Sequence, residues 1–147
     1  MIDGLNKALE DLQERFLKIE MNVKKEIGTT GEKIKSDASV NASAIGFFDS
    51  YGNWVELSGK VKGNAFEAGN GYRIWVNAGE MAAYIEFGTG EYAKNEVGAR
   101  PQNWRDLAYE FYVNGKGELP ARPYIYPSWV QNTTGLLDRL RTAIKRK

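Results

Sequence analysis

The sequence predicts an α+β domain in which a long N-terminal amphipathic helix and a C-terminal helix pack on a small twisted antiparallel β-sheet, with a long loop excursion. Three observations predict it: a periodic apolar stripe at the N-terminus, short alternating segments around a Gly-Asn-Gly turn, and a second amphipathic stretch at the C-terminus. A chain of 147 residues suits one domain. We expect a single domain, 1–147, made of a helical N-terminal segment 1–45, a β-hairpin core 54–90, an excursion 91–120 and a C-terminal helix within 121–147.

The N-terminal stripe has the spacing of one face of an α-helix, and Asp3 can cap its start. The apolar residues are Ile2, Leu5, Leu9, Leu12, Phe16, Ile19, Val23 and Ile27. Gly28-Thr29-Thr30-Gly31 predicts a break, which gives a helix about 35–40 Å long at about 1.5 Å per residue. Residues 32–45 are expected to continue as a second helical piece. The near-heptad spacing leaves two interpretations open: a helix packed on its own core, or one packed partly against a neighbouring subunit.

The middle of the chain predicts a β-hairpin. Residues 61–68 and 72–77 flank Gly69-Asn70-Gly71, a typical hairpin turn. Tyr72, Ile74 and Val76 should face one side of the sheet, and Trp75 the other. Before the hairpin, "GFFDSYGNW" is expected to be a loop carrying anchoring aromatics.

The excursion over 98–120 is expected to hold a short helix, and a helix should close the chain. In the excursion, Trp104, Leu107, Ala108 and Phe111 would share a helical face that Gly115 could end. In "LPARPYIYPSW", Pro123 is placed to start a helical turn, and Pro127 fits in a first turn. Further on, "TTGLLDRLRTAIKRK" predicts an amphipathic helix with apolar residues Leu136, Leu137, Leu140, Ala143 and Ile144. Thr133 or Thr134 can cap that helix.

Composition argues against several classes of protein. The 20 basic and 19 acidic residues leave a net charge of +1, so gripping a phosphate backbone is not expected to be the main role. The chain has no cysteine and no histidine, which excludes thiol chemistry and removes the commonest proton shuttle. No apolar run is long enough to cross a bilayer. We therefore expect no enzyme, cofactor, metal site or membrane association.

Glu86 lies inside the apolar run "AAYIEFGTG". As a strand, this run places Tyr84 and Glu86 on one side; as a short helix, it places Ala83 and Phe87 on one face. A half-buried carboxylate needs partners, and arginine can bind both oxygens. Arg100 and Arg122, each within an "ARP" triplet, are both candidates. The pair either fixes the turn structurally or forms an inter-subunit contact.

Together, two motifs resemble the tail-completion, or head–tail joining, family of long-tailed bacteriophages and prophages. The first is "Y-x-E-F-G-T", here Tyr84, Glu86, Phe87, Gly88 and Thr89. The second is "A-R-P-(aromatic)-(aliphatic)-x-P", here Ala121, Arg122, Pro123, Tyr124, Ile125 and Pro127. Two departures concern the loops. "DSYGNWVEL" is a loose echo of the relatives' "P-x-x-T-G-x-L", and the excursion between the motifs is longer than in relatives.

The resemblance implies a structural virion protein without catalytic activity. Copies would form a ring, expected to be a hexamer, between the tail tube protein and the head-side connector or stopper protein, with genomic DNA passing through the lumen. The protein would assemble in the host cytoplasm and reside in the neck of the virion. The implied interface residues are Tyr84, Glu86, Phe87, Gly88, Thr89, Arg122, Pro123 and Tyr124, with a docking loop at Arg100, Trp104 and Phe111. Replacing Glu86 with alanine should then impair joining more than solubility.

Three alternatives stay open. A head-side stopper or adaptor, or another minor tail protein, would keep the virion but change the position. An aromatic-rich module for glycans or peptides would be a stable monomer that binds ligand without a ring partner. A nucleic-acid binder would show steeply salt-dependent affinity for DNA, and the near-neutral charge argues against it.

Overall fold

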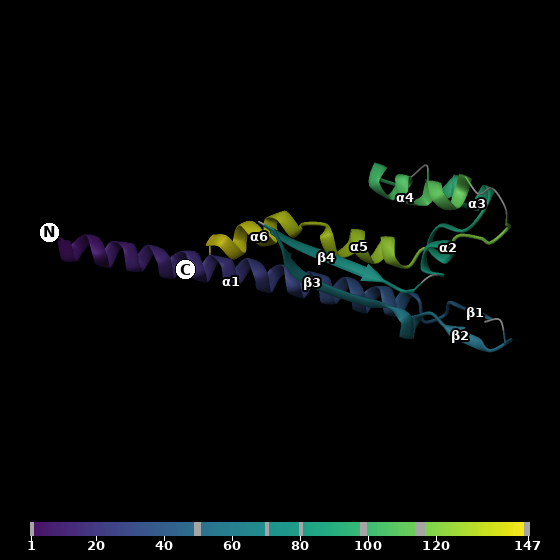
Figure 1. The fold of residues 1–147 in the computed structure, drawn as a ribbon, viewed down its shortest axis with the longest axis horizontal. Helices are drawn as coiled ribbons and strands as arrows, with labels where there is room; N and C mark the ends of the chain where they lie inside the picture. Colours follow the sequence, from purple (N-terminus) through teal and green to yellow (C-terminus); the bar gives the residue numbers. More distant parts are fainter. Residues whose placement is uncertain are drawn as a thin grey trace.

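The structure, a computed structural model, describes residues 2–48, 51–69, 71–79, 81–97, 100–113 and 117–145. Its elements confirm the α+β class, and they are arranged along one long helix (Figure 1). That helix, α1 (Ile2–Asn41), is followed by the short hairpin β1 (Gly46–Phe48) and β2 (Trp54–Glu56). The remaining elements are η1 (Ser58–Lys60), β3 (Lys62–Ala68), β4 (Gly71–Asn77), α2 (Ala82–Phe87), α3 (Glu91–Val97), α4 (Gln102–Val113), α5 (Ile125–Thr133) and α6 (Leu136–Lys145).

Helix α1 runs without interruption through the predicted break at residues 28–31, and the prediction of two helical pieces is wrong. At 40 residues it is about 60 Å long. The glycines cost helix propensity of about 1 kcal/mol each, but packing offsets this cost. Gly31 is buried where β3 crosses, and a Cβ there would lie 3.3 Å from the Ala65 Cβ. The buried Thr30 hydroxyl donates to the Glu26 carbonyl oxygen over 2.9 Å.

The central hairpin follows the prediction closely. Strands β3 and β4 pair antiparallel, with Ala65 opposite Ile74 and Ala68 opposite Gly71. One face of β4, with Tyr72, Ile74 and Val76, is half-buried, and the other is exposed. The half-buried face is on the side of α1, which packs against both strands. On another side of α1, helices α5 and α6 run back along it (Figure 1).

Three local predictions need correction. "GFFDSYGNW" includes the strands of a second small hairpin, β1–β2; its Phe47 packs against the core as an anchor, whereas Phe48, Tyr51 and Trp54 are exposed. The expected C-terminal helix is two helices, separated at Gly135, which has a φ of 72°. The Thr133 and Thr134 hydroxyls donate to carbonyls four residues earlier in α5 instead of capping α6. The excursion holds α3 and α4, while Gly115 lies outside the described residues.

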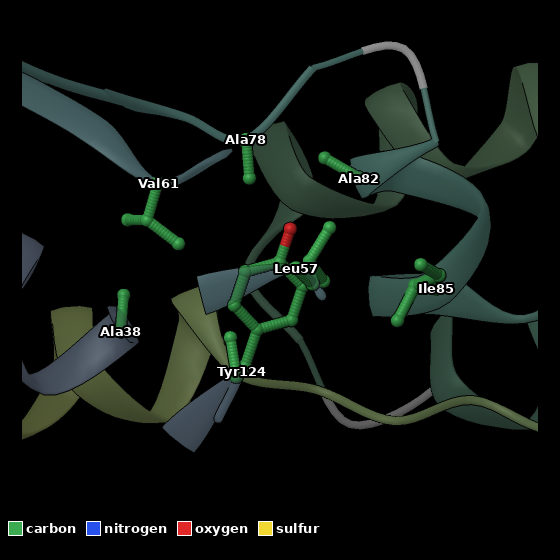
Figure 2. Close-up of a cluster of buried hydrophobic side chains, with 8 residues drawn as sticks. Ala38, Leu57, Val61, Ala78, Ala82, Ile85 and Tyr124 are labelled. Carbon is green, nitrogen blue, oxygen red and sulfur yellow. The ribbon is translucent and has the colours of Figure 1, made fainter. Parts of the chain in front are cut away.

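The core lies where the end of α1, the base of the β3–β4 hairpin, α2 and the start of α5 meet (Figure 2). Its buried members are Ala38, Ala42, Leu57, Val61, Ala78, Ala82, Ile85 and Tyr124. Half of them are alanines, so Tyr124 supplies much of the volume at the centre. This core therefore depends on the chain segment that precedes α5, and it places that segment beside α2.

Candidate functional site

The two motifs that carry the family resemblance meet in space at Glu86. Helix α2, rather than a strand, carries this residue, and its side chain is 2% exposed. The sequence from Ala121 to Pro127 comes back over α2, where the Arg122 backbone N–H donates to the Ile85 carbonyl over 2.8 Å. The Glu86 carboxylate thus faces the start of α5 from the end of α2.

Glu86 accepts the free backbone donors of the first turn of α5. Its Oε2 accepts from the N–H groups of Tyr124 and Ile125 over 2.8 and 2.9 Å, and its Oε1 accepts from the N–H of Tyr126 over 3.0 Å. The next residue, Pro127, has no N–H to satisfy. A helix start leaves four backbone N–H positions without a partner inside the helix. Here three of these N–H groups donate to Glu86, and the fourth position is the proline. The negative charge also lies at the positive end of the helix dipole.

Arg100, rather than Arg122, is the arginine partner of Glu86. Its Nη1 lies 3.0 Å from the Glu86 Oε1, and both side chains are 2% exposed. The guanidinium also lies against three aromatic rings, with its Cζ 5.0, 5.7 and 4.6 Å from the ring centroids of Phe87, Trp104 and Tyr126. Opposite charges and ring faces compensate for the lost hydration of the buried cation.

The Gly88-Thr89 turn fixes a second crossing between the motifs. The Thr89 N–H donates to the Leu119 carbonyl, and the Leu119 N–H donates to the Thr89 Oγ1, both over 2.9 Å. Gly88 has a φ of 74°, and a Cβ there would lie 2.6 Å from the Leu119 carbonyl oxygen and 2.7 Å from the Ala121 nitrogen. The turn therefore needs glycine both for its conformation and for the close approach of the chain.

Tyr124 is fully buried beside this cluster. Its ring fills the core, and its hydroxyl lies among apolar side chains that include Leu57 (Figure 2). Within the part of the chain that the structure describes, this hydroxyl has no hydrogen-bond partner. Burial raises the pKa of the Tyr124 hydroxyl well above its usual range, and the negative charge of Glu86 raises this pKa further.

Replacing Tyr124 with phenylalanine is expected to leave stability at neutral pH unchanged or to raise it by about 1 kcal/mol, because an unpaired buried hydroxyl is lost. Above about pH 10 the unfolded wild type loses its tyrosine proton while the folded protein keeps it. The wild type should then lose up to about 1.4 kcal/mol per pH unit relative to Tyr124→Phe. Urea unfolding of both proteins between neutral pH and pH 11 measures this difference. A loss above about 1 kcal/mol for the variant at pH 7 would contradict the unpaired hydroxyl.

The structure divides the other predicted site residues into buried and accessible ones. Phe87, Gly88 and Tyr124 are buried with Glu86, so they can influence a partner only through the elements that they hold. Accessible positions are Tyr84 and Arg122, which are exposed, and Thr89 and Pro123, which are half-buried. A contact by either motif with another molecule would therefore involve the second group.

The predicted docking loop is joined to the same cluster. Arg100 is buried against Glu86, and the Trp104 ring packs edge-on against the rings of Phe87 and Tyr126, with centroids 6.0 and 5.1 Å away. The side chain of Phe111 lies outside the described residues. Among the α4 side chains that the structure describes, Leu107 and Tyr109 are exposed apolar residues.

Sequence reasoning missed the backbone partners of Glu86 and the role of Tyr126. An amide donor carries no residue signature, so the three N–H groups could be found only through the missing donor of Pro127 and the need of a buried acid for partners. Tyr126 follows Tyr124 by two residues in the second motif, and this aromatic pair was the available signal.

The described ranges contain neither a metal cluster nor a membrane span. Across them, no group of three or more acidic, histidine or cysteine side chains is placed to hold a metal ion. In the same ranges, no helix combines the length and the apolar character needed to span a bilayer.

The chain was compared with protein-family models, with curated proteins and with solved structures, and none of them matches it significantly.

Proposed function

We propose that this protein is a structural component of the head–tail junction of a long-tailed bacteriophage or prophage. Copies form a ring that completes the tail and joins it to the connector of the capsid, and DNA passes through the lumen. The protein contacts the tail tube on one side and a head-side neck protein on the other, and it catalyses no reaction. It assembles in the host cytoplasm and remains in the neck of the virion.

The observation that carries the proposal is the contact between the two motifs. They are well separated in the chain, since the first ends at Thr89 and the second begins at Ala121. In the structure Glu86 of the first motif binds the Tyr124 and Ile125 amides within the second. Each motif therefore needs the other, which supplies a physical reason for their occurrence together. It supports the family resemblance because two unrelated chance matches have no reason to meet.

A structural role fits the state of the acid. Both Glu86 oxygens already accept hydrogen bonds, from Arg100 and three backbone amides. A general base must reach a proton on its substrate, and a carboxylate that is 2% exposed and fully bonded is poorly placed to do so. The arrangement is typical of a group that fixes the relative position of two helices.

The surface also suits a subunit with several neighbours. Exposed aromatic residues Phe48, Tyr51 and Trp54 lie in and between the β1 and β2 strands at one end of the molecule, and exposed leucines line α1 at the other (Figure 1). Contiguous apolar patches on a protein surface often mark interaction sites. Two such ends allow one chain to contact different molecules at once.

The test is electron microscopy of lysates from a phage that lacks this gene, with the gene supplied on a plasmid as the control. We expect filled heads and separate tails without the gene, and joined particles when it is supplied. Joined, infectious particles in its absence would exclude a joining role. Binding of the purified protein to isolated heads rather than tails would place it on the head side.

A further inference from the structure

From Leu5 to Phe16, helix α1 carries an apolar face that the rest of the chain leaves exposed. We call residues 4–21 the arm. Most of it extends beyond α6 and beyond the tip of the β3–β4 hairpin (Figure 1), while its last residues, from Lys18, lie beside the end of α6. Leu5, Leu9, Leu12 and Phe16 on its stripe are 63%, 50%, 51% and 66% exposed. Of the two interpretations of the stripe, packing on the chain's own core therefore fails for this segment.

The same face is covered farther along the helix. Ile27 is half-buried, and Ile34 and Ala38 are fully buried. These positions continue the spacing of three and four residues that begins on the arm, so one stripe runs from the arm into the core. Cover by the chain itself begins at Ile19, which is half-buried and lines a cavity together with Ile144 of α6. It continues at Asn22, whose Nδ2 donates to the Ala143 carbonyl over 3.2 Å. The arm thus continues an interior face outside the body of the protein.

We propose that the arm pairs with the arm of a second copy of this chain, as a parallel and in-register two-stranded coiled coil. In the heptad notation, Leu9 and Phe16 occupy position a, and Leu5, Leu12 and Ile19 occupy position d. The paired segment, from Leu5 to Ile19, is about 22 Å long at about 1.5 Å per residue. It ends where α6 begins to cover α1, so the two bodies diverge from that point.

The charges of the arm identify the occupant. Five of its charged residues occupy the outer positions b, c and f of the heptad: Lys7, Glu10, Asp11, Glu14 and Lys18. The other two flank the seam and have opposite charges, Arg15 at position g and Glu20 at position e. In a parallel pair, position g faces position e five residues later on the other helix. Two symmetric Arg15–Glu20 pairs then form, and no like charges meet across the seam.

Other occupants fit less well. An antiparallel pair that sets Leu9 against Leu12 places Arg15 opposite Ala8, so the two flanking charges find no ionic partner. A membrane surface is disfavoured because the arm carries four acidic and three basic residues, whereas interfacial helices are rich in lysine and arginine. The charge pattern therefore favours a second arm in the parallel orientation.

The pairing does not depend on the proposed phage function, because it concerns the purified chain in solution. Its experiment is sedimentation equilibrium of the full-length protein over a range of micromolar concentrations. We expect the mass of two chains at the upper end and a concentration-dependent decrease below it. If the protein did not join heads and tails, the expected dimer of the purified chain would be unaffected. If the purified chain were a monomer, the proposed joining role would likewise be unaffected.

Two matched substitutions test the seam. Phe16→Glu places a charge at position a and should weaken pairing by about 100-fold or more, since two buried like charges would meet. Leu17→Glu, at outer position b, should leave pairing unchanged. The two native side chains are 66% and 61% exposed in the single chain, so neither change should disturb the fold. The proposal would be overturned if the wild type sedimented as a single chain. It would also be overturned if the wild type formed a larger ring whose mass Phe16→Glu did not lower.

Orientation is tested by cross-linking, for which the absence of native cysteine gives a clean background. Leu9→Cys should form a disulfide-linked dimer under mild oxidation, because parallel pairing places the two copies of position 9 together. Leu17→Cys should cross-link far less. Arg15→Glu should weaken pairing, and adding Glu20→Arg should restore it. Cross-linking that is equal for the two cysteine variants would exclude a parallel seam.

Discussion

Glu86→Ala is expected to lower the free energy of unfolding by about 3–5 kcal/mol, because it leaves the buried Arg100 charge without its partner. It also removes the acceptor from three amides at the start of α5. Natural domains are stable by only about 5–15 kcal/mol, so much of the protein should be unfolded or insoluble at 37 °C. The sequence alone predicted that Glu86→Ala would impair joining more than solubility, and the burial of the Glu86–Arg100 pair adds an expected loss of stability. Urea unfolding at neutral pH measures the loss.

Comparison with Arg100→Met separates the two functions of the carboxylate. That variant removes the cation but leaves Glu86 with its three backbone donors, so it should cost less than Glu86→Ala. As a control, Glu32→Ala breaks an exposed pair with Lys35 and should change stability by less than about 1 kcal/mol. If Glu86→Ala cost no more than this control, the Glu86 contacts would not stabilise the fold.

Gly88→Ala is expected to be the second most damaging change, with a loss of about 3 kcal/mol or more. The φ of 74° and ψ of −166° at Gly88 belong to a region that is almost restricted to glycine and costs other residues about 1–3 kcal/mol. The added methyl would also overlap two backbone atoms of residues 119 and 121, and such overpacking costs a further 1–3 kcal/mol or so. Thermal and urea unfolding should both detect the loss.

Gly52→Ala is the matched control. Gly52 also has a positive φ, of 80°, but an added Cβ there would meet no atom within 4 Å. The free energy of unfolding that Gly52→Ala loses should therefore reflect backbone conformation alone, at about 1–2 kcal/mol. Equal losses at the two positions would mean that the chain at 119–121 can move away, and that its close approach to Gly88 is not a fixed feature.

Local patterns predicted most of the elements. Alternation around Gly69-Asn70-Gly71 placed the central hairpin within one residue at each strand, because both the turn and the faces are encoded locally. The Gly-Thr-Thr-Gly segment failed because its helical state is imposed by β3, α5 and α6, which lie far away in the sequence. "GFFDSYGNW" was predicted in part: Phe47 packs against the core as expected, whereas Phe48 and Trp54 pack edge-on against each other and are exposed, because aromatic character alone does not distinguish core from surface positions.

The site could be predicted only incompletely. A carboxylate in an apolar run signals that partners must exist, and the two "ARP" triplets supplied the candidates. Choosing Arg100 over Arg122 required knowing that α4 packs against α2. The exposure of the arm could not be inferred from its stripe, because a face that packs on the same chain and one that packs on another chain have the same spacing.

The connection from Glu86 to the start of α5 also has a consequence for the order of folding. The first turn of α5 depends on an acceptor 38 residues earlier in the chain, so this helix cannot be completed by local interactions. During synthesis, α1, the β3–β4 hairpin and α2 leave the ribosome first and wait with Tyr124 absent from their core. Closing so long a loop slows folding. We therefore expect the nascent chain to remain incompletely packed until its last quarter has emerged.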